Sequence, residues 1–112
     1  MNNVLIVGLG LIGGSIAKAL KVSKNDLNVY GFDKSEAVLK AAIGDETINS
    51  YINIDDFNSI KDNHIDFIII CTPLSITIEI LDLLKSKRIL NTNVTITEVS
   101  SSKLLIEEKF GK

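Results

Sequence analysis

The chain has 112 residues, which is enough for one domain but short for two. Hydrophobic residues make up 46% of the sequence and charged residues 23%, an ordinary globular balance, and the formal net charge is −2. Because no basic run occurs, the composition argues against nucleic acid as a partner. We also expect neither a signal peptide nor a membrane span, since the start of the chain carries no positive charge and glycines interrupt its apolar stretch.

The first predicted strand, residues 4–7, leads straight into a glycine-rich turn and then a helix with apolar residues four apart. Gly8 permits a tight turn, and Gly10 lets the backbone come close to a bound group. Gly13 lets the helix pack closely on the strand. The helix start presents unpaired N–H groups and a positive dipole end, which suit a pyrophosphate. The expected cofactor contacts in this stretch are Gly8, Gly10, Leu11, Ile12 and Gly13.

A polar turn at residues 24–26 precedes a second predicted strand, residues 29–32, which ends in Asp33. Asp33 follows the third glycine by about 20 residues, the spacing of a carboxylate that hydrogen-bonds a dinucleotide ribose. A glycine turn alone also occurs without a ligand, and an aspartate alone is often a turn or capping residue. Together these features predict dinucleotide binding. The carboxylate repels a 2′-phosphate and so favours NAD over NADP, although Lys34 beside it softens that repulsion.

The middle of the chain carries weaker signals. Ser35 is a predicted N-cap for a helix over residues 36–43, and Gly44 is a natural stop for that helix. Residues 45–65 contain many Asn and Asp, and their scattered apolar residues indicate only a short strand and a helical turn.

A continuous apolar run over residues 67–71 predicts a strand covered on both faces, as in parallel sheets. Thr72 and Pro73 end this strand, and a helix is predicted over residues 74–85. Cys71 is expected to be a small core residue. As the single cysteine, it excludes an internal disulfide and fits a reducing compartment, so we predict a cytoplasmic location.

The last predicted strand, residues 94–97, is followed by a serine cluster at residues 100–102 and a predicted helix over residues 103–110. The serines are either helix caps or hydroxyls that face a cofactor and a substrate. Strands that alternate with helices give a Rossmann-type α/β fold, a doubly wound parallel sheet with helices on both faces. We expect one dinucleotide-binding domain over residues 1–112.

Ligands of such sheets bind outside the carboxyl ends of the strands. The glycine turn, Asp33, Thr72, Pro73 and the serine cluster all follow those ends. His64, the only histidine, and Arg88 precede strands, so we interpret both as solvated residues at the opposite edge. Hydride transfer commonly needs a base or an electrostatic partner for the substrate. We therefore expect the catalytic site to be incomplete in this chain, and we predict no metal site.

Two motifs carry a family resemblance. The GLGLIGGS stretch at residues 8–15 and the TEVSSSK stretch at residues 97–103 resemble the glycine turn and the T-D-x-G-S-V-K segment of prephenate dehydrogenases. The ICTP strand end at residues 70–73 also fits. The resemblance covers the whole chain but only the cofactor domain of that family. It implies oxidative decarboxylation of prephenate to 4-hydroxyphenylpyruvate in tyrosine biosynthesis, with hydride passing to the nicotinamide as carbon dioxide leaves.

The resemblance also assigns residues. Ser101 matches the serine that contacts the substrate hydroxyl near the nicotinamide, which makes it the candidate catalytic residue, and Lys103 matches a lysine whose role stays open. Glu98 and Ser100 replace the usual aspartate and glycine. The family's catalytic histidine, in an H-P-x-x-G stretch, and its helical C-terminal domain do not occur in these residues. We therefore expect a cofactor-binding fragment or a truncated gene product, and a homodimer where the C-terminal domain is present.

Other hypotheses stay open at this point. A stand-alone NAD-sensing module that gates a transporter or repressor needs the same glycine turn and Asp33, but no serine at the nicotinamide end. Another dehydrogenase family, acting on β-hydroxy acids or glycerol phosphate, shares the turn, and the TEVSSSK segment argues against it. A methyltransferase fits less well, because Asp33 suits a dinucleotide. These residues do not separate prephenate from its amino analogue arogenate.

Overall fold

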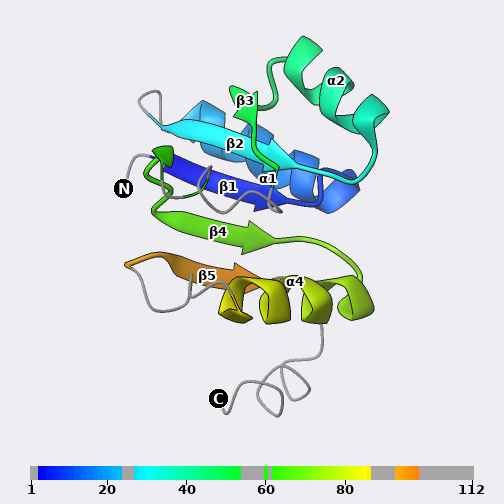
Figure 1. Cartoon of the computed structure of the whole chain (residues 1–112). Coiled ribbons are helices and arrows are strands. Elements are labelled where there is room, and N and C mark those ends of the chain that lie inside the picture. Colours follow the sequence, from blue (N-terminus) through cyan, green and yellow to red (C-terminus); the bar gives the residue numbers. More distant parts are fainter. Residues whose placement is uncertain (1–2, 24–26, 54–59, 61, 87–92, 99–112) are drawn as a thin grey trace.

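The centre of the fold is β1 (Asn3–Val7), which is buried from its second residue onward and therefore lies between two covered faces. The computed structural model describes residues 3–23, 27–53, 60, 62–86 and 93–98. In it, β1 is the middle strand of a parallel sheet with the order β3-β2-β1-β4-β5 (Figure 1). The other strands are β2 (Asn28–Phe32), β3 (Ser50–Tyr51), β4 (Phe67–Ile70) and β5 (Thr95–Glu98).

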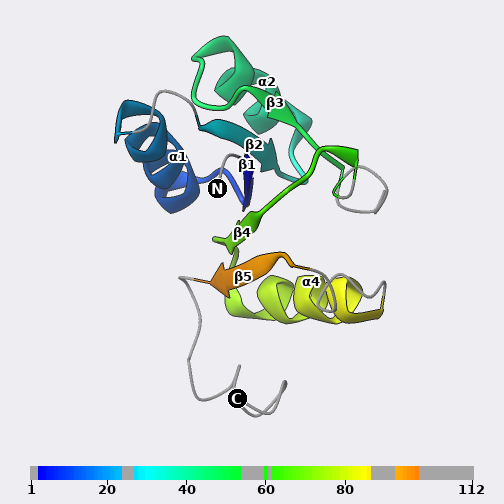
Figure 2. The ribbon, with the colours of Figure 1, turned by 90° about the vertical axis from the view of Figure 1, so that its left-hand side faces the viewer.

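Helices cover both faces of this sheet. The described helices are α1 (Leu11–Ser23), α2 (Glu36–Gly44) and α4 (Leu74–Ser86). Figure 1 shows α1 behind the strands and α4 in front of them, and Figure 2 shows the two helices on opposite sides of β1 and β4. This arrangement confirms the doubly wound α/β fold. Among the described helices, none has both the length and the apolarity needed to cross a bilayer.

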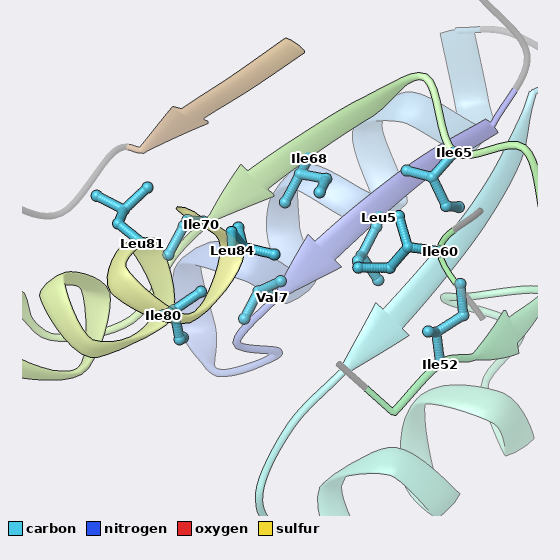
Figure 3. Close-up of a cluster of buried hydrophobic side chains, with 10 residues drawn as sticks. All are labelled: Leu5, Val7, Ile52, Ile60, Ile65, Ile68, Ile70, Ile80, Leu81 and Leu84. Atoms are coloured by element: carbon cyan, nitrogen blue, oxygen red, sulfur yellow. The ribbon is translucent and has the colours of Figure 1, made fainter. Parts of the chain in front are cut away.

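The hydrophobic core is divided by the sheet into two clusters. Alternation along β1 sends Leu5 and Val7 to one face and Val4 and Ile6 to the other. The first face packs against α4, as Figure 3 shows for the side chains between β1, β4 and that helix. The second face packs against α1 and α2. Full burial of one aliphatic side chain contributes roughly 1.5–3 kcal/mol, so both helical layers are tied firmly to the sheet.

The carboxyl ends of the central strands are level with one another. Val7 is paired with Phe32 on one side and with Ile70 on the other. Two further backbone bonds extend this alignment by one residue, since the Gly8 N–H donates to the Phe32 carbonyl at 2.7 Å and the Cys71 N–H donates to the Val7 carbonyl at 2.8 Å. The loops that leave β1, β2 and β4 therefore start side by side.

Most of the predicted elements are confirmed. Ser35 caps α2, because its hydroxyl accepts a hydrogen bond from the Val38 N–H at 3.3 Å. The short strand expected after residue 45 is β3. The helix stop differs in detail: α2 continues through Gly44, and the left-handed residue is Glu46, with a φ of 61°.

One predicted strand is displaced in the structure, and other predicted elements fall on residues that the structure does not describe. The last strand is displaced by one residue from the predicted 94–97, because its ladder with β4 pairs Phe67 with Thr95 and Ile70 with Glu98. The predicted turn at residues 24–26, most of the expected helical turn before residue 62, and the helix at residues 103–110 lie outside the described residues.

Candidate functional site

The glycine turn after β1 is held in a conformation that only glycine adopts readily. Gly8 has a φ of +93°. A Cβ built on Gly8 would lie 2.8 Å from the Thr72 Cγ2 and 3.0 Å from the Cys71 carbonyl oxygen, so the turn rests directly on the end of β4. Both the backbone angle and this close approach explain why glycine occupies the position.

The other two glycines of the motif differ sharply from each other. A Cβ on Gly13 would overlap the Gly8 carbonyl oxygen, so the first turn of α1 packs tightly on the glycine turn itself. A Cβ on Gly10 would meet nothing within 4 Å. Gly10 is thus exposed toward open space, where a ligand can approach its backbone. The Gly14 N–H bonds the Gly10 carbonyl at 2.8 Å, which leaves the preceding N–H groups of α1 without a partner inside the helix.

Asp33 connects β2 to the glycine turn. One carboxylate oxygen accepts a hydrogen bond from the Leu9 N–H at 2.9 Å, and the other accepts one from the Ser35 N–H at 2.9 Å. The second bond is the turn role that an isolated aspartate often has. The first bond holds the carboxylate beside the turn. Each oxygen keeps a further lone pair, so Asp33 can still accept hydrogen bonds from ligand hydroxyls.

A pocket of about 630 Å³ opens at this edge of the sheet. Its volume falls in the range of sites for small molecules and cofactors. Six predicted site residues line it: Gly8, Gly10, Asp33, Lys34, Thr72 and Pro73. The remaining lining residues are Val7, Phe32, Cys71, Ile76, Glu79, Ile80 and Leu83. The structure therefore gathers the ends of β1, β2 and β4 and one side of α4 around a single pocket.

Three other predicted contacts lie around the turn without lining the pocket. The side chains of Leu11 and Ile12 are 90% and 54% exposed, and Gly13 is buried behind the turn. At these positions the groups suited to a ligand are the N–H groups of the first helical turn, which carry the positive end of the helix dipole.

Most of the chain matches a known protein family. Residues 16–111 match the family described as prephenate dehydrogenase, nucleotide-binding domain. The chain belongs to this family. The family that the sequence resembles is thereby confirmed.

Curated relatives and a solved structure agree with the family. The chain is 34% identical over 106 residues to prephenate dehydrogenase of Bacillus subtilis (strain 168), covering 91% of the chain and 26% of the relative. It is 33% identical over 109 residues to that of Lactococcus lactis subsp. cremoris (strain MG1363), covering 96% and 29%. The crystal structure of Aquifex aeolicus prephenate dehydrogenase with hydroxyphenyl propionate and NAD⁺ is 32% identical, with a TM-score of 0.81, covering all of the chain and 39% of that protein. The chain thus spans under a third of the curated relatives' length.

Cys71 and His64 lie at opposite edges of the sheet. Cys71, expected as a core residue, is half-buried: it packs against the core cluster under α1 and also lines the pocket. Burial raises the pKa of its thiol. His64 is exposed, and its carbonyl accepts a hydrogen bond from the Asn3 side chain at the amino end of β1, far from the pocket edge. Arg88, the serine cluster with Ser101, and Lys103 lie outside the described residues.

Sequence reasoning missed the wall of the pocket that α4 supplies. The sequence predicted only a helix over residues 74–85, yet its residues Ile76, Glu79, Ile80 and Leu83 line the pocket. Their spacing of three and four residues was the available signal. In the part of the chain that the structure describes, no group of three or more His, Cys, Asp or Glu side chains is placed to hold a metal ion.

Proposed function

We propose that this chain is the NAD-binding domain of an enzyme that oxidatively decarboxylates prephenate. The observation that carries the proposal is the Asp33 carboxylate, held 2.9 Å from the Leu9 N–H at the mouth of the pocket beside an open Gly10. Family membership and the NAD⁺ in the related Aquifex aeolicus enzyme support the choice of cofactor. The proposal treats residues 1–112 as one dinucleotide-binding domain.

The residues of the pocket fit the parts of NAD by their chemistry. The N–H groups of Leu11, Ile12 and Gly13 suit the pyrophosphate, and Gly10 leaves room for its approach. Asp33 suits the hydroxyls of the adenosine ribose, and its charge opposes a 2′-phosphate. The apolar side of α4 suits the adenine ring. When bound, NAD supplies the acceptor for a hydride.

The substrate side of the proposal rests on the resemblance. Ser101 is proposed to contact the substrate hydroxyl near the nicotinamide. His64 lies at the opposite edge and supplies no base, so turnover is proposed to need groups from beyond these residues. A homodimer and a cytoplasmic location are proposed for the whole enzyme. Ser101→Ala in a full-length protein is expected to lower turnover of prephenate and arogenate; unchanged turnover contradicts the role of Ser101.

The cofactor proposal is tested by calorimetric titration of the chain with NAD and then NADP. We expect saturable binding of NAD, tighter than that of NADP. Asp33→Ala is expected to weaken NAD binding by about tenfold or more, since one hydrogen bond from a ribose hydroxyl to a carboxylate contributes about 1.5–3 kcal/mol, and to narrow the difference in affinity between NAD and NADP. Asp62→Ala, which removes an exposed carboxylate outside the pocket, is the matched control. An unchanged affinity of Asp33→Ala for both cofactors removes Asp33 from the site.

A further inference from the structure

One buried hydroxyl behind the pocket has no part in the proposed function so far. Thr77, in the first turn of α4, is 0% exposed. Its hydroxyl donates to the Thr72 carbonyl at 2.9 Å, and the two threonine hydroxyl oxygens lie 2.8 Å apart. A hydroxyl has one hydrogen, and Thr77 uses its own on the carbonyl. The Thr72 hydroxyl is therefore the donor in the second bond.

These two hydrogen bonds fix the side-chain rotamer of Thr72, and the rotamer decides which of its groups faces the glycine turn. A threonine carries a hydroxyl and a methyl group on the same Cβ, so a bond that fixes one branch also fixes the other. With the hydroxyl directed at Thr77, the Thr72 Cγ2 lies against Gly8, 2.8 Å from where a Cβ would stand. The Thr72 methyl group thus packs directly against the glycine turn and supports it.

We infer that Thr77 is a positioning residue for the cofactor: its hydroxyl selects the Thr72 rotamer that supports the glycine turn. Both Thr72 and Gly8 line the pocket, whereas Thr77 does not. Thr77 acts through Thr72 and touches no ligand. The inference rests on the proposed NAD binding, and it adds a residue that neither the motif nor its spacing indicates.

The test separates the hydroxyl from the volume of the side chain. Thr77→Val keeps the branched shape and removes both hydrogen bonds, so we expect NAD affinity to fall about five- to tenfold. Thr77→Ser keeps the hydroxyl and loses the methyl group, so it is expected to lower the melting temperature while its NAD affinity stays within about twofold of the parent. Thr47→Val, at a buried threonine that does not line the pocket, is the matched control with unchanged affinity.

A second readout does not depend on NAD. The nuclear Overhauser effect between the Thr72 methyl protons and the Gly8 Hα protons is expected in the parent and in Thr77→Ser, and is expected to weaken in Thr77→Val. If Thr77→Val keeps both this effect and the NAD affinity of the parent, the inference is wrong and the proposed function stands. If the parent shows the effect but binds no NAD, the proposed function is wrong instead.

Discussion

The two edges of the sheet use similar polar residues for opposite purposes. At the amino edge, the Asn3 side chain donates to the carbonyls of Asn63 and His64 at 3.0 and 3.1 Å and accepts from the Asn28 side chain at 3.0 Å. The Asn3 backbone also exchanges bonds with Asp66. At the carboxyl edge, the N–H groups of the first turn of α1 have no partner inside the helix, and the Asp33 oxygens keep accepting capacity.

The difference teaches how to recognise the functional edge. At the amino edge the polar groups of Asn3 satisfy the protein itself, joining the starts of β1, β2 and β4. At the carboxyl edge the backbone forms a tight glycine turn, and Gly8, Gly10 and Asp33 line a pocket there. Changes at the first edge should therefore affect stability alone, whereas changes at the second should affect binding, with a loss of stability only where the glycine turn is tightly packed.

The largest expected effect is at Gly13. In Gly13→Ala the new Cβ would overlap the Gly8 carbonyl oxygen, which is backbone and has little freedom to move. The clash should lower the free energy of unfolding by about 3 kcal/mol. This loss exceeds the gain of roughly 1 kcal/mol from the higher helix propensity of alanine. Urea unfolding measures the change. A variant as stable as the parent would show that α1 does not pack on the turn as described.

Gly10→Ala should separate binding from stability. The new Cβ meets nothing within 4 Å, but alanine is a poorer N-cap than glycine, so the free energy of unfolding should fall by about 0.5–1 kcal/mol. NAD affinity should fall about tenfold, equivalent to 1.4 kcal/mol, because the Cβ occupies the space of the approaching phosphates. Calorimetry and urea unfolding on the same sample provide both values. Equal losses in the free energy of NAD binding and in the free energy of unfolding would contradict the contrast between the two edges.

Asn3→Ala should have the smallest effect, and it should lower stability without changing NAD affinity. It removes three side-chain hydrogen bonds, two of them exposed, so the expected loss is about 1 kcal/mol of unfolding free energy. NAD affinity should not change. Asn93→Ala, at an exposed asparagine before β5, is the control for the substitution itself. A drop in NAD affinity for Asn3→Ala alone would mean that the two edges are coupled through β1.

The sequence was most informative where the physics is local. The apolar run of β4 and the Ser35 cap of α2 were readable because burial and capping depend on neighbouring residues. The register of β5 was displaced by one residue, since alternation such as that around Thr95 leaves open which residue begins the ladder. The placement of the glycine turn, Asp33, Thr72 and Pro73 at one edge of the sheet followed from the general rule for parallel sheets.

For the site, the limits of the sequence were set by contacts between distant segments. The glycine turn and Asp33 were predicted from spacing, and both line the pocket. The bond from the Leu9 N–H to Asp33 spans two strands, so no local pattern could reveal it. The same holds for Thr77, which in the sequence is one of several β-branched residues in a helix, and whose importance depends on the position of Thr72.

The double role of Asp33 has a consequence for cofactor engineering. The usual route from NAD to NADP replaces such a carboxylate with a small neutral residue, but here that change also takes the acceptor from the Leu9 N–H. A substitution of Asp33 therefore changes both the cofactor specificity and the hydrogen bond that holds the glycine turn. A designer who wants to change the nucleotide must first supply a new acceptor for that amide.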